Sequence, residues 1–368
     1  MTRGVETIVP GRKALGDVLR SGKILNVYNG VDPTATRIHL GHAVPLRKLQ
    51  LLVELGHKVT FLIGDLTAFI GDTSDKNSER PQLTEEEILS NWQTYQRQAS
   101  KFLDFSKVIV VRNTTWLNKL NFTDVIKLAR HFSLNDFNSR ELIKKRLEAG
   151  DNINLAEAFY PLAQGYDSWY LKTDLQIGGP EQIFNMQAGR TLIRDIDNRE
   201  SFCLSNSILE GTDGRKMSKT WGNAIWIEDT PDEMFGKTMS LKDELIGQYF
   251  ALATNLPLDQ IPRDGHPMNL KKQLALQIVS ELHGQPAAEK AQENFIKTFQ
   301  QKEISPASEL KISGVDDLVK HNIIDSRSEW KRLVADGAVE RDDVKINDPD
   351  DLSPGVYRIG KKRFIKFV

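Results

Sequence analysis

The sequence predicts an α/β protein: a doubly wound parallel sheet with a helical insertion, then an α-helical domain and a small C-terminal α+β domain. Three observations support this prediction. Apolar strand-like stretches alternate with amphipathic helical stretches up to about residue 228, as in a parallel sheet covered by helices. The chain is then wholly helical, and from about residue 315 it reads as a small mixed unit.

Three strands and two helices are expected in the first half of the sheet. The strands are apolar runs that end in turn residues, at 23–32, 57–65 and 107–113. The helices are expected at 40–55 and 83–105, the second opening with a Thr84–Glu87 capping box. Ligands of such a sheet bind beyond the carboxyl ends of its strands, where Tyr28, Asp32, Gly64 and Asp72 fall.

The remaining elements divide the chain into domains. A helical insertion is expected at about 114–150, and the strands of the second half at 174–179 and 201–206. The expected domains are 1–228 for the sheet with its insertion, 229–301 for a helical domain, 302–314 for a linker and 315–368 for the terminal domain.

Composition excludes several classes of protein. With 39% hydrophobic and 27% charged residues and a net charge of −1, the chain has no overall basic field for nucleic acid. The single Cys203 excludes an intramolecular disulfide and fits a reducing compartment. No apolar run approaches membrane-spanning length, and the start "MTRGVETIVPGRK" has no apolar signal core. A cytoplasmic protein without membrane contact is therefore expected.

The sequence "HLGH" at 39–42 follows the first strand. Histidines spaced (i, i+3) share one face of a helix, and the N–H groups of a helix N-terminus attract phosphate. On its own, the motif fits either a phosphate site or two partly exposed histidines satisfied by their neighbours.

A second motif, "GTDGRKMSKT" at 211–220, follows the last strand of the sheet. Lys216 and Lys219 bracket Met217 and Ser218 on a glycine-containing loop, where point charges suit a phosphate chain that gains charge as a bond breaks. The alternative is a solvated basic loop. Because one such motif opens each half of the sheet, the two together favour polyphosphate binding.

The two motifs resemble the hallmark motifs of class I aminoacyl-tRNA synthetases, with Leu40 for the usual isoleucine and Thr220 for a final serine. Four further stretches, "VYNGVDPT", "IGDTSDK", "YPLAQGYD" and "IGGPEQIFN", occur in the order and spacing of the tyrosyl-tRNA synthetase family. The resemblance runs from about residue 24 to the C-terminus. It implies a Rossmann-like catalytic domain, a helical domain for the anticodon region of tRNA and a terminal RNA-binding domain of the alpha-L type.

The resemblance also implies a tyrosine site. Tyr160, Gln164 and Asp167 form one polar stripe on a helix, which by itself could equally face solvent or form a small polar network. In the family pattern, Tyr28 and Asp167 receive the phenolic hydroxyl of tyrosine. The ammonium and carboxylate groups fall to Asp72, Tyr160, Gln164 and Gln182.

An ATP site is implied in the same way. His39 and Thr34 would contact the phosphates, Gly41 would let adenine approach, and His42 would lie near the nucleoside. The other ATP residues implied are Asp32, Gly179, Glu181, Lys216, Met217 and Lys219, and the catalytic residues are His39, His42, Lys216, Lys219 and Thr34. Glu181 departs from the family's aspartate by one methylene, and Pro180 stands where serine or threonine is common, so the ribose contact is open.

The resemblance predicts a tyrosine–tRNA ligase. L-tyrosine and ATP would give tyrosyl-adenylate and pyrophosphate, and tyrosyl would pass to tRNA(Tyr). Mg²⁺ is expected to arrive with ATP rather than in a protein metal site, and a homodimer is implied through the insertion. Three alternatives stay open: a tryptophanyl-tRNA synthetase, a small-molecule adenylyltransferase, and a catalytically silent RNA-binding protein.

Overall fold

The structure is a computed structural model that describes residues 2–34, 36–71, 84–218, 221–300, 309–310, 312, 314–321, 323–342, 344–360 and 363–368. The chain forms two compact units, Met1–Gly284 and Gln285–Val368.

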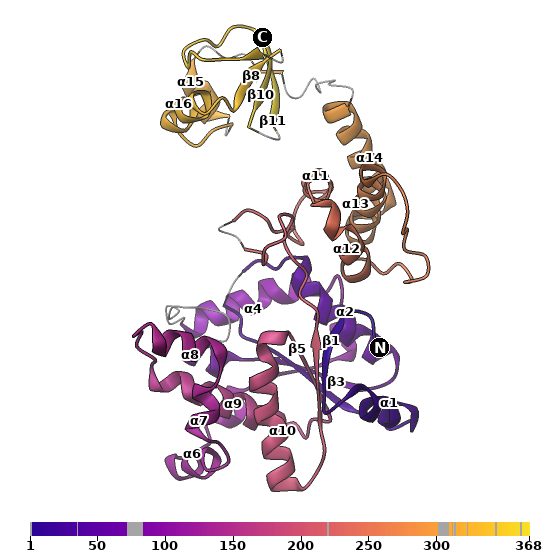
Figure 1. Cartoon of the computed structure of the whole chain (residues 1–368), viewed down its shortest axis with the longest axis vertical. Helices are drawn as coiled ribbons and strands as arrows, with labels where there is room; N and C mark the ends of the chain where they lie inside the picture. The colour runs from indigo at the N-terminus through magenta and orange to yellow at the C-terminus, as the bar shows by residue number, and fades with distance from the viewer. Residues whose placement is uncertain are drawn as a thin grey trace. The chain divides into compact units, whose positions relative to one another are not determined.

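The first unit is built on a six-stranded sheet (Figure 1). Its strands are β1 (Val5–Val9), β2 (Asn26–Val31), β3 (Lys58–Ile63), β4 (Ile109–Arg112), β5 (Leu175–Gly178) and β6 (Phe202–Asn206). They lie in the order β1-β6-β5-β2-β3-β4, and every neighbouring pair except β1 and β6 is parallel. The predicted doubly wound parallel sheet is confirmed.

Strand β1 lies outside the strands that the sequence predicts. It pairs antiparallel with β6, with Val9 opposite Cys203. Its five residues form an edge strand in which Val5 is buried and Glu6 is exposed. So short a strand has no long apolar run, and an antiparallel edge is not required by the strand–helix–strand repeat.

Helices connect the strands and cover the sheet. They are α1 (Arg12–Arg20), α2 (Leu40–Glu54), α3 (Asp65–Ile70), α4 (Glu85–Ala99), α9 (Leu155–Tyr170) and α10 (Ile183–Asp197). The predicted capping box opens α4: the Thr84 hydroxyl accepts from the N–H of Glu87, and the Glu87 carboxylate accepts from the N–H of Thr84. The buried face of α4 sets Trp92 and Tyr95 against Phe61 of β3, with ring centroids 5.5 and 5.9 Å away.

Between β4 and α9 the chain is helical, as predicted for the insertion. The helices are α5 (Thr114–Leu117), α6 (Phe122–Ala129), α7 (Leu134–Asn138) and α8 (Glu141–Glu148). In Figure 1, α6, α7 and α8 gather beside α9. Large apolar side chains on these helices remain exposed, among them Phe122 at 79% and Leu134 at 64%.

After β6 the first unit ends in α11 (Pro231–Met239), α12 (Ile246–Ala253) and α13 (Pro267–His283). Arg3 docks α12 onto the sheet by donating to four main-chain oxygens at the end of that helix, those of Phe250, Ala251, Thr254 and Leu256. Arg47 of α2 donates to the Ala253 oxygen and forms an ion pair with Glu281 of α13. Cations at helix C-termini are favourable because the last carbonyls have no partner within the helix.

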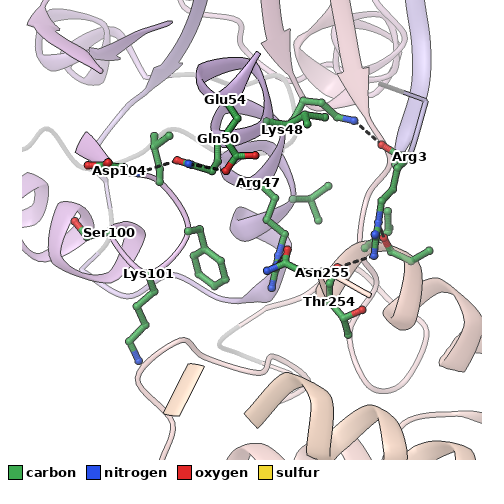
Figure 2. A pocket seen from close by; sticks show the side chains of 17 residues that line it. Arg3, Arg47, Lys48, Gln50, Glu54, Ser100, Lys101, Asp104, Thr254 and Asn255 are labelled. Carbon is green, nitrogen blue, oxygen red and sulfur yellow. Dashed lines mark hydrogen bonds between the residues drawn. The ribbon is translucent and has the colours of Figure 1, made fainter. Parts of the chain in front are cut away.

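These side chains line a hollow of about 700 Å³ (Figure 2). The ammonium group of Lys48 also lies at its edge, 2.7 Å from the main-chain oxygen of Arg3. The hollow lies between α2, the segment 100–104 after α4 and the end of α12, and its cations Arg3, Arg47 and Lys48 already contact carbonyl oxygens. It contains none of the residues predicted for the active site.

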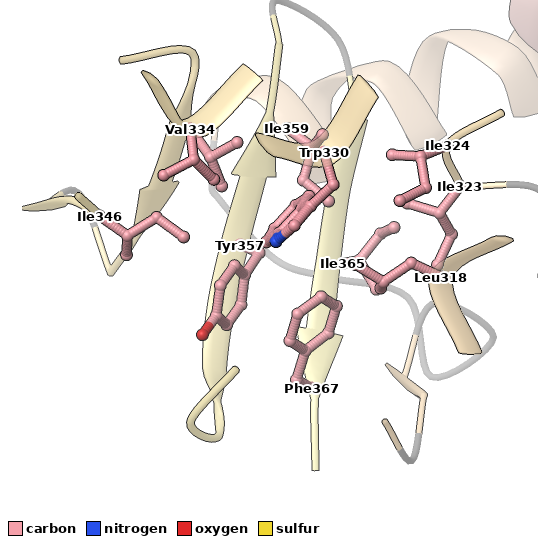
Figure 3. Packing of buried hydrophobic residues seen from close by; sticks show 11 residues of the cluster. Leu318, Ile323, Ile324, Trp330, Val334, Ile346, Tyr357, Ile359, Ile365 and Phe367 are labelled. Carbon is pink, nitrogen blue, oxygen red and sulfur yellow. The ribbon is translucent and has the colours of Figure 1, made fainter. Parts of the chain in front are cut away.

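The second unit carries its own sheet and core. Its helices are α14 (Gln285–Phe295), α15 (Val315–Lys320) and α16 (Arg327–Ala335), with a π-helical turn at Ile296–Gln300. Strands β7 (Glu309–Leu310), β8 (Val339–Arg341), β9 (Val344–Lys345), β10 (Gly355–Ile359) and β11 (Arg363–Phe367) form a sheet in the order β7-β11-β10-β8-β9. Trp330 of α16 packs with Tyr357 and Phe367 of the sheet in one buried cluster (Figure 3).

Candidate active site

A cavity of about 270 Å³ opens at the carboxyl ends of β2 and β5. Most of the predicted tyrosine and ATP residues line it: Tyr28, Asp32, Thr34, His42, Tyr160, Gln164, Asp167, Gly179, Glu181 and Gln182. These residues come from four stretches of the chain and meet where the topology of a parallel sheet predicts a ligand site.

The other predicted residues stand in two groups. His39, Gly41, Lys216 and Met217 are described but do not line this cavity. Lys216 nevertheless lies close enough to both histidines to lower their pKa values. Asp72 and Lys219 lie outside the described residues.

The floor of the cavity holds Tyr28 and Asp167, both almost fully buried. Asp167 accepts from the side-chain amide of Asn113 at 3.1 Å and from the indole N–H of Trp116 at 2.7 Å. Burial raises the pKa of Asp167 to about 7 even though both donors lower it. Burial also raises the pKa of Tyr28, with the charge of Asp167 adding to the effect.

A chain of hydrogen bonds joins Asp167 to Asp32, a second acid of the cavity. Asn113 donates to the Thr67 hydroxyl at 3.2 Å, and Thr67 donates to Asp32 at 2.7 Å. Tyr160 donates to the second oxygen of Asp32 at 2.9 Å. Gly64 is required beside this chain, since a Cβ there would lie 2.1 Å from the Asp32 carboxylate.

Sequence reasoning missed Thr67, Asn113 and Trp116. Asn113 is the last residue of the strand expected at 107–113 and comes directly after β4, so the carboxyl-end signal that drew attention to Asp32 was also present there. The sequence holds no such signal for Trp116, whose indole reads as an ordinary core side chain until its N–H partner is known.

The histidine motif forms the N-terminus of α2. His39 is the N-cap, and its Nδ1 accepts from the N–H of Gly41, while Nδ1 of His42 accepts from the N–H of His39, both at 3.2 Å. Each Nδ1 therefore lacks a proton, which leaves Nε2–H as a donor on both rings. Burial lowers the pKa of His39 to about 2 and that of His42 to about 4. Both rings are thus neutral donors at pH 7.

Gly41 makes this arrangement possible. A Cβ at Gly41 would lie 3.0 Å from two atoms of the His39 ring. A larger residue at this position would therefore require the His39 ring to shift by a few tenths of an ångström. This role in shaping the motif stands beside the adenine contact that the family resemblance implies.

A short ladder of main-chain hydrogen bonds joins the histidine motif at 39–42 to residues 225–227. These residues follow the loop at 211–220 that carries Lys216, called the lysine loop below. The N–H of Leu40 donates to the Ile225 oxygen and the N–H of Ile227 donates to the Ile38 oxygen, each at 3.0 Å. Between them the ring of Trp226 lies 5.6 Å from that of His39. Main-chain hydrogen bonds therefore connect the first phosphate motif to the segment that directly follows the second.

At the other side of the cavity, Pro180 opens a short 3₁₀ turn, Pro180–Gln182, just after β5. A Cβ on Gly179 would lie 2.4 Å from an oxygen of Glu181, so the longer acid folds back over the glycine. The glutamate carboxylate thus stays beside Gly179, at the mouth of the cavity.

Two features are absent from the part of the chain that the structure describes. Among the described residues, no group of three or more His, Cys, Asp or Glu side chains is arranged so that it could hold a metal ion. None of the described helices combines the length and the apolar character needed to cross a membrane.

Comparison with known proteins agrees with this geometry. The family profile of class I tRNA synthetases for tryptophan and tyrosine matches residues 20–300. The chain is 42% identical to the tyrosine–tRNA ligase of Carboxydothermus hydrogenoformans and 41% identical to that of Thermotoga maritima, over 100% of this chain and 96% of each relative. Its fold is similar to that of a truncated Aspergillus nidulans mitochondrial tyrosyl-tRNA synthetase, with a TM-score of 0.66 and 23% identity, over 81% of this chain and 92% of that one. The chain belongs to the tyrosyl-tRNA synthetase family of class I aminoacyl-tRNA synthetases.

Proposed function

We propose that this chain activates L-tyrosine with ATP and transfers the tyrosyl group to the 3′-terminal adenosine of tRNA(Tyr). The observation that carries the proposal is the buried Tyr28–Asp167 pair at the floor of a cavity whose wall includes His42 of the phosphate motif. A phenolic hydroxyl can both donate to this pair and accept from it, whereas an indole N–H can only donate, which favours tyrosine over tryptophan.

Tyrosine would enter with its hydroxyl toward Tyr28 and Asp167. Its ammonium group would meet Tyr160 and Gln164, with Asp72 as the third partner implied by the family. Gln182 would lie near the carboxylate, on the side of the cavity that also holds Glu181. In this orientation the reacting carboxylate points toward the elements expected to bind ATP.

The first reaction joins a carboxylate oxygen of tyrosine to the α-phosphorus of ATP as the bond to pyrophosphate breaks. Neutral His39 and His42 would donate from Nε2, and Thr34, Lys216, Met217 and Lys219 would contact the triphosphate. Asp32 would line the reacting end, and Gly179 and Glu181 would face the ribose. Catalysis then rests on positioning and charge stabilisation, with Mg²⁺ supplied on ATP as part of the substrate.

The second reaction needs tRNA. A terminal ribose hydroxyl attacks the carbonyl carbon of the adenylate, and AMP leaves. We assign the helical region 229–301 to the anticodon region of tRNA, and 315–368, after a linker at 302–314, to general RNA binding. Arg327, Lys331 and Arg332 lie together on α16 and support this assignment. A cytoplasmic location fits a chain whose single cysteine is buried and free.

Tyrosine-dependent exchange of pyrophosphate into ATP tests the first reaction. We expect exchange with tyrosine and none with tryptophan. Phenylalanine should be a poor substrate because it leaves buried hydrogen-bonding groups unpaired, at about 1–3 kcal/mol for each. Exchange stimulated by tryptophan alone would overturn the assignment, and no exchange with any amino acid would favour a catalytically silent RNA-binding protein.

We also propose a homodimer that forms through the insertion. The exposed apolar side chains Phe122 and Leu134 of the insertion, with Leu155 at the start of the next helix, support this, since an interface would cover them. Sedimentation equilibrium should give twice the mass of the chain, and F122D should shift it toward the monomer. A monomeric wild-type chain would contradict the proposal.

A further inference from the structure

Hydrogen bonds from Asn223, a residue that is only 3% exposed, hold the lysine loop in its conformation. The side-chain amide of Asn223 donates to the Asp213 carboxylate at 2.7 Å and to the Lys216 main-chain oxygen at 3.1 Å. Its oxygen accepts from the N–H of Ser218 at 2.8 Å. The amide group of Asn223 thus forms hydrogen bonds with three residues of the loop, with two of them as donor and with one as acceptor.

The main chain of Asn223 holds the other limb of the loop. The N–H of Thr212 donates to the Asn223 oxygen at 2.9 Å. Gly211 packs so closely that a Cβ there would lie 2.4 Å from the amide nitrogen of Asn223. Both limbs of the described loop, 211–213 and 216–218, therefore touch this single residue.

Asn223 also stands two residues before the ladder that reaches the histidine motif. The Ile225 oxygen accepts from the N–H at the start of α2, and Ile227 closes the ladder from the other side. The position of Asn223 relative to His39 is consequently fixed by main-chain bonds. The loop residues that Asn223 binds are therefore kept at a fixed distance from the N-terminus of α2.

We propose that Asn223 is a positioning residue for the adenylation reaction, fixing the main chain at Lys216 relative to the histidine motif. This inference rests on the proposed function. Its effect belongs to the phosphate end of the site, because Tyr28 and Asp167 stand on β2 and α9 and have no contact with the loop in the described hydrogen bonds. Loss of the Asn223 hydrogen bonds should slow adenylate formation and leave the binding of tyrosine intact.

Two variants and a control test the inference. N223A removes all three side-chain bonds. N223D keeps the shape and the acceptor for Ser218 but sets an oxygen against Asp213. The control N26A also removes an asparagine that donates to a main-chain oxygen, that of Lys172, but at the amino end of β2. K216A gives the scale of losing the lysine itself.

The measurements are single-turnover adenylate formation, tyrosine binding without ATP by intrinsic fluorescence, and thermal unfolding. We expect N223A to slow adenylate formation by about ten- to a hundredfold, the usual effect of a misplaced catalytic group. Its loss should not exceed that of K216A. Tyrosine affinity should match wild type, and N26A should form adenylate at the wild-type rate.

The pH profile of N223D separates positioning from general destabilisation. Its new carboxyl would lie against the Asp213 carboxylate, which also binds Arg215, and against the main-chain oxygen of Lys216. The other charged groups near the loop are Glu210 and Lys242, which approach it at Gly214. The adjacent Asp213 charge favours protonation, and a protonated acid can again donate to Asp213. N223D should therefore regain part of its rate as the pH falls from about 8 to about 6, and N223A should not.

Several outcomes would overturn the inference. One is a normal adenylation rate in N223A alongside normal wild-type turnover, which would leave the proposed function standing. Another is a parallel loss of tyrosine affinity and rate, and a third is identical pH profiles for N223A and N223D. A wild-type chain without tyrosine-dependent turnover would instead overturn the proposed function, and this inference with it.

Discussion

Burial gives Asp167 an unusual affinity for its proton. Its pKa is raised from 3.8 to about 7, so the folded chain holds this proton more tightly than the unfolded chain does. The stabilisation from this group is complete below about pH 4 and is lost as the pH rises through 7. We expect D167N to lack this loss, which amounts to at most about 4 kcal/mol. Urea unfolding of both proteins at pH 4 and pH 8 measures it, and equal pH dependence would contradict the prediction.

The sequence predicts which residue types form the site better than it predicts their protonation states and hydrogen bonds. The two histidines, the polar stripe on α9 and the acids after β2 follow from motif and position in the sequence. The neutral Nε2–H form of both rings does not, because it depends on which N–H groups of the helix end reach each Nδ1. Thr67 has no signal in the sequence either, since what marks it is a hydrogen bond with Asn113, a residue distant in sequence, whereas the position of Asn113 at the end of a strand was a signal that went unused.

Among the elements, α12 is bound at its C-terminal end by a residue far away in the chain. Arg3 donates to four main-chain oxygens at its end, and R3M would leave these groups with poorer partners. We expect the free energy of unfolding of the first unit to fall by about 1–3 kcal/mol. The matched control is R20M, which breaks only an exposed ion pair with Asp17 and should cost about 0–1 kcal/mol. Equal unfolding midpoints for the two variants would show that Arg3 does not fasten α12.

The strands of the parallel sheet were predictable because they are buried on both faces and read as apolar runs between turns. Strand β1 was not, because it is short and lies at the edge. The hollow of Figure 2 was also beyond prediction: Arg3, Arg47 and Lys48 look like ordinary surface cations until the ends of α12 and α13 are in place. Local patterns specify elements, whereas contacts between distant segments specify how they dock.

On the scale of the whole molecule, the second unit should serve tRNA and not adenylation. Residues 306–368 carry 12 Lys and Arg against 12 Asp and Glu, so any attraction for RNA comes from how the charges are arranged. Ending the chain at Ile312 should preserve tyrosine-dependent exchange and strongly reduce tRNA charging. Affinity of the intact chain for tRNA should fall steeply with added salt. Undiminished charging by the shortened chain would remove the role assigned to this unit.

The ladder between Ile38–Leu40 and Ile225–Ile227 has a consequence for how such chains can diverge. Its bonds run from backbone to backbone, and every amino acid except proline supplies both partners. Side chains along it can therefore be exchanged over evolutionary time without separating the two phosphate motifs, provided that they still fill the core. Proline at 40 or 227, where an N–H must donate, is the substitution that selection would remove. The spacing of the motifs is thus inherited through geometry and is largely independent of the identity of the residues that maintain it.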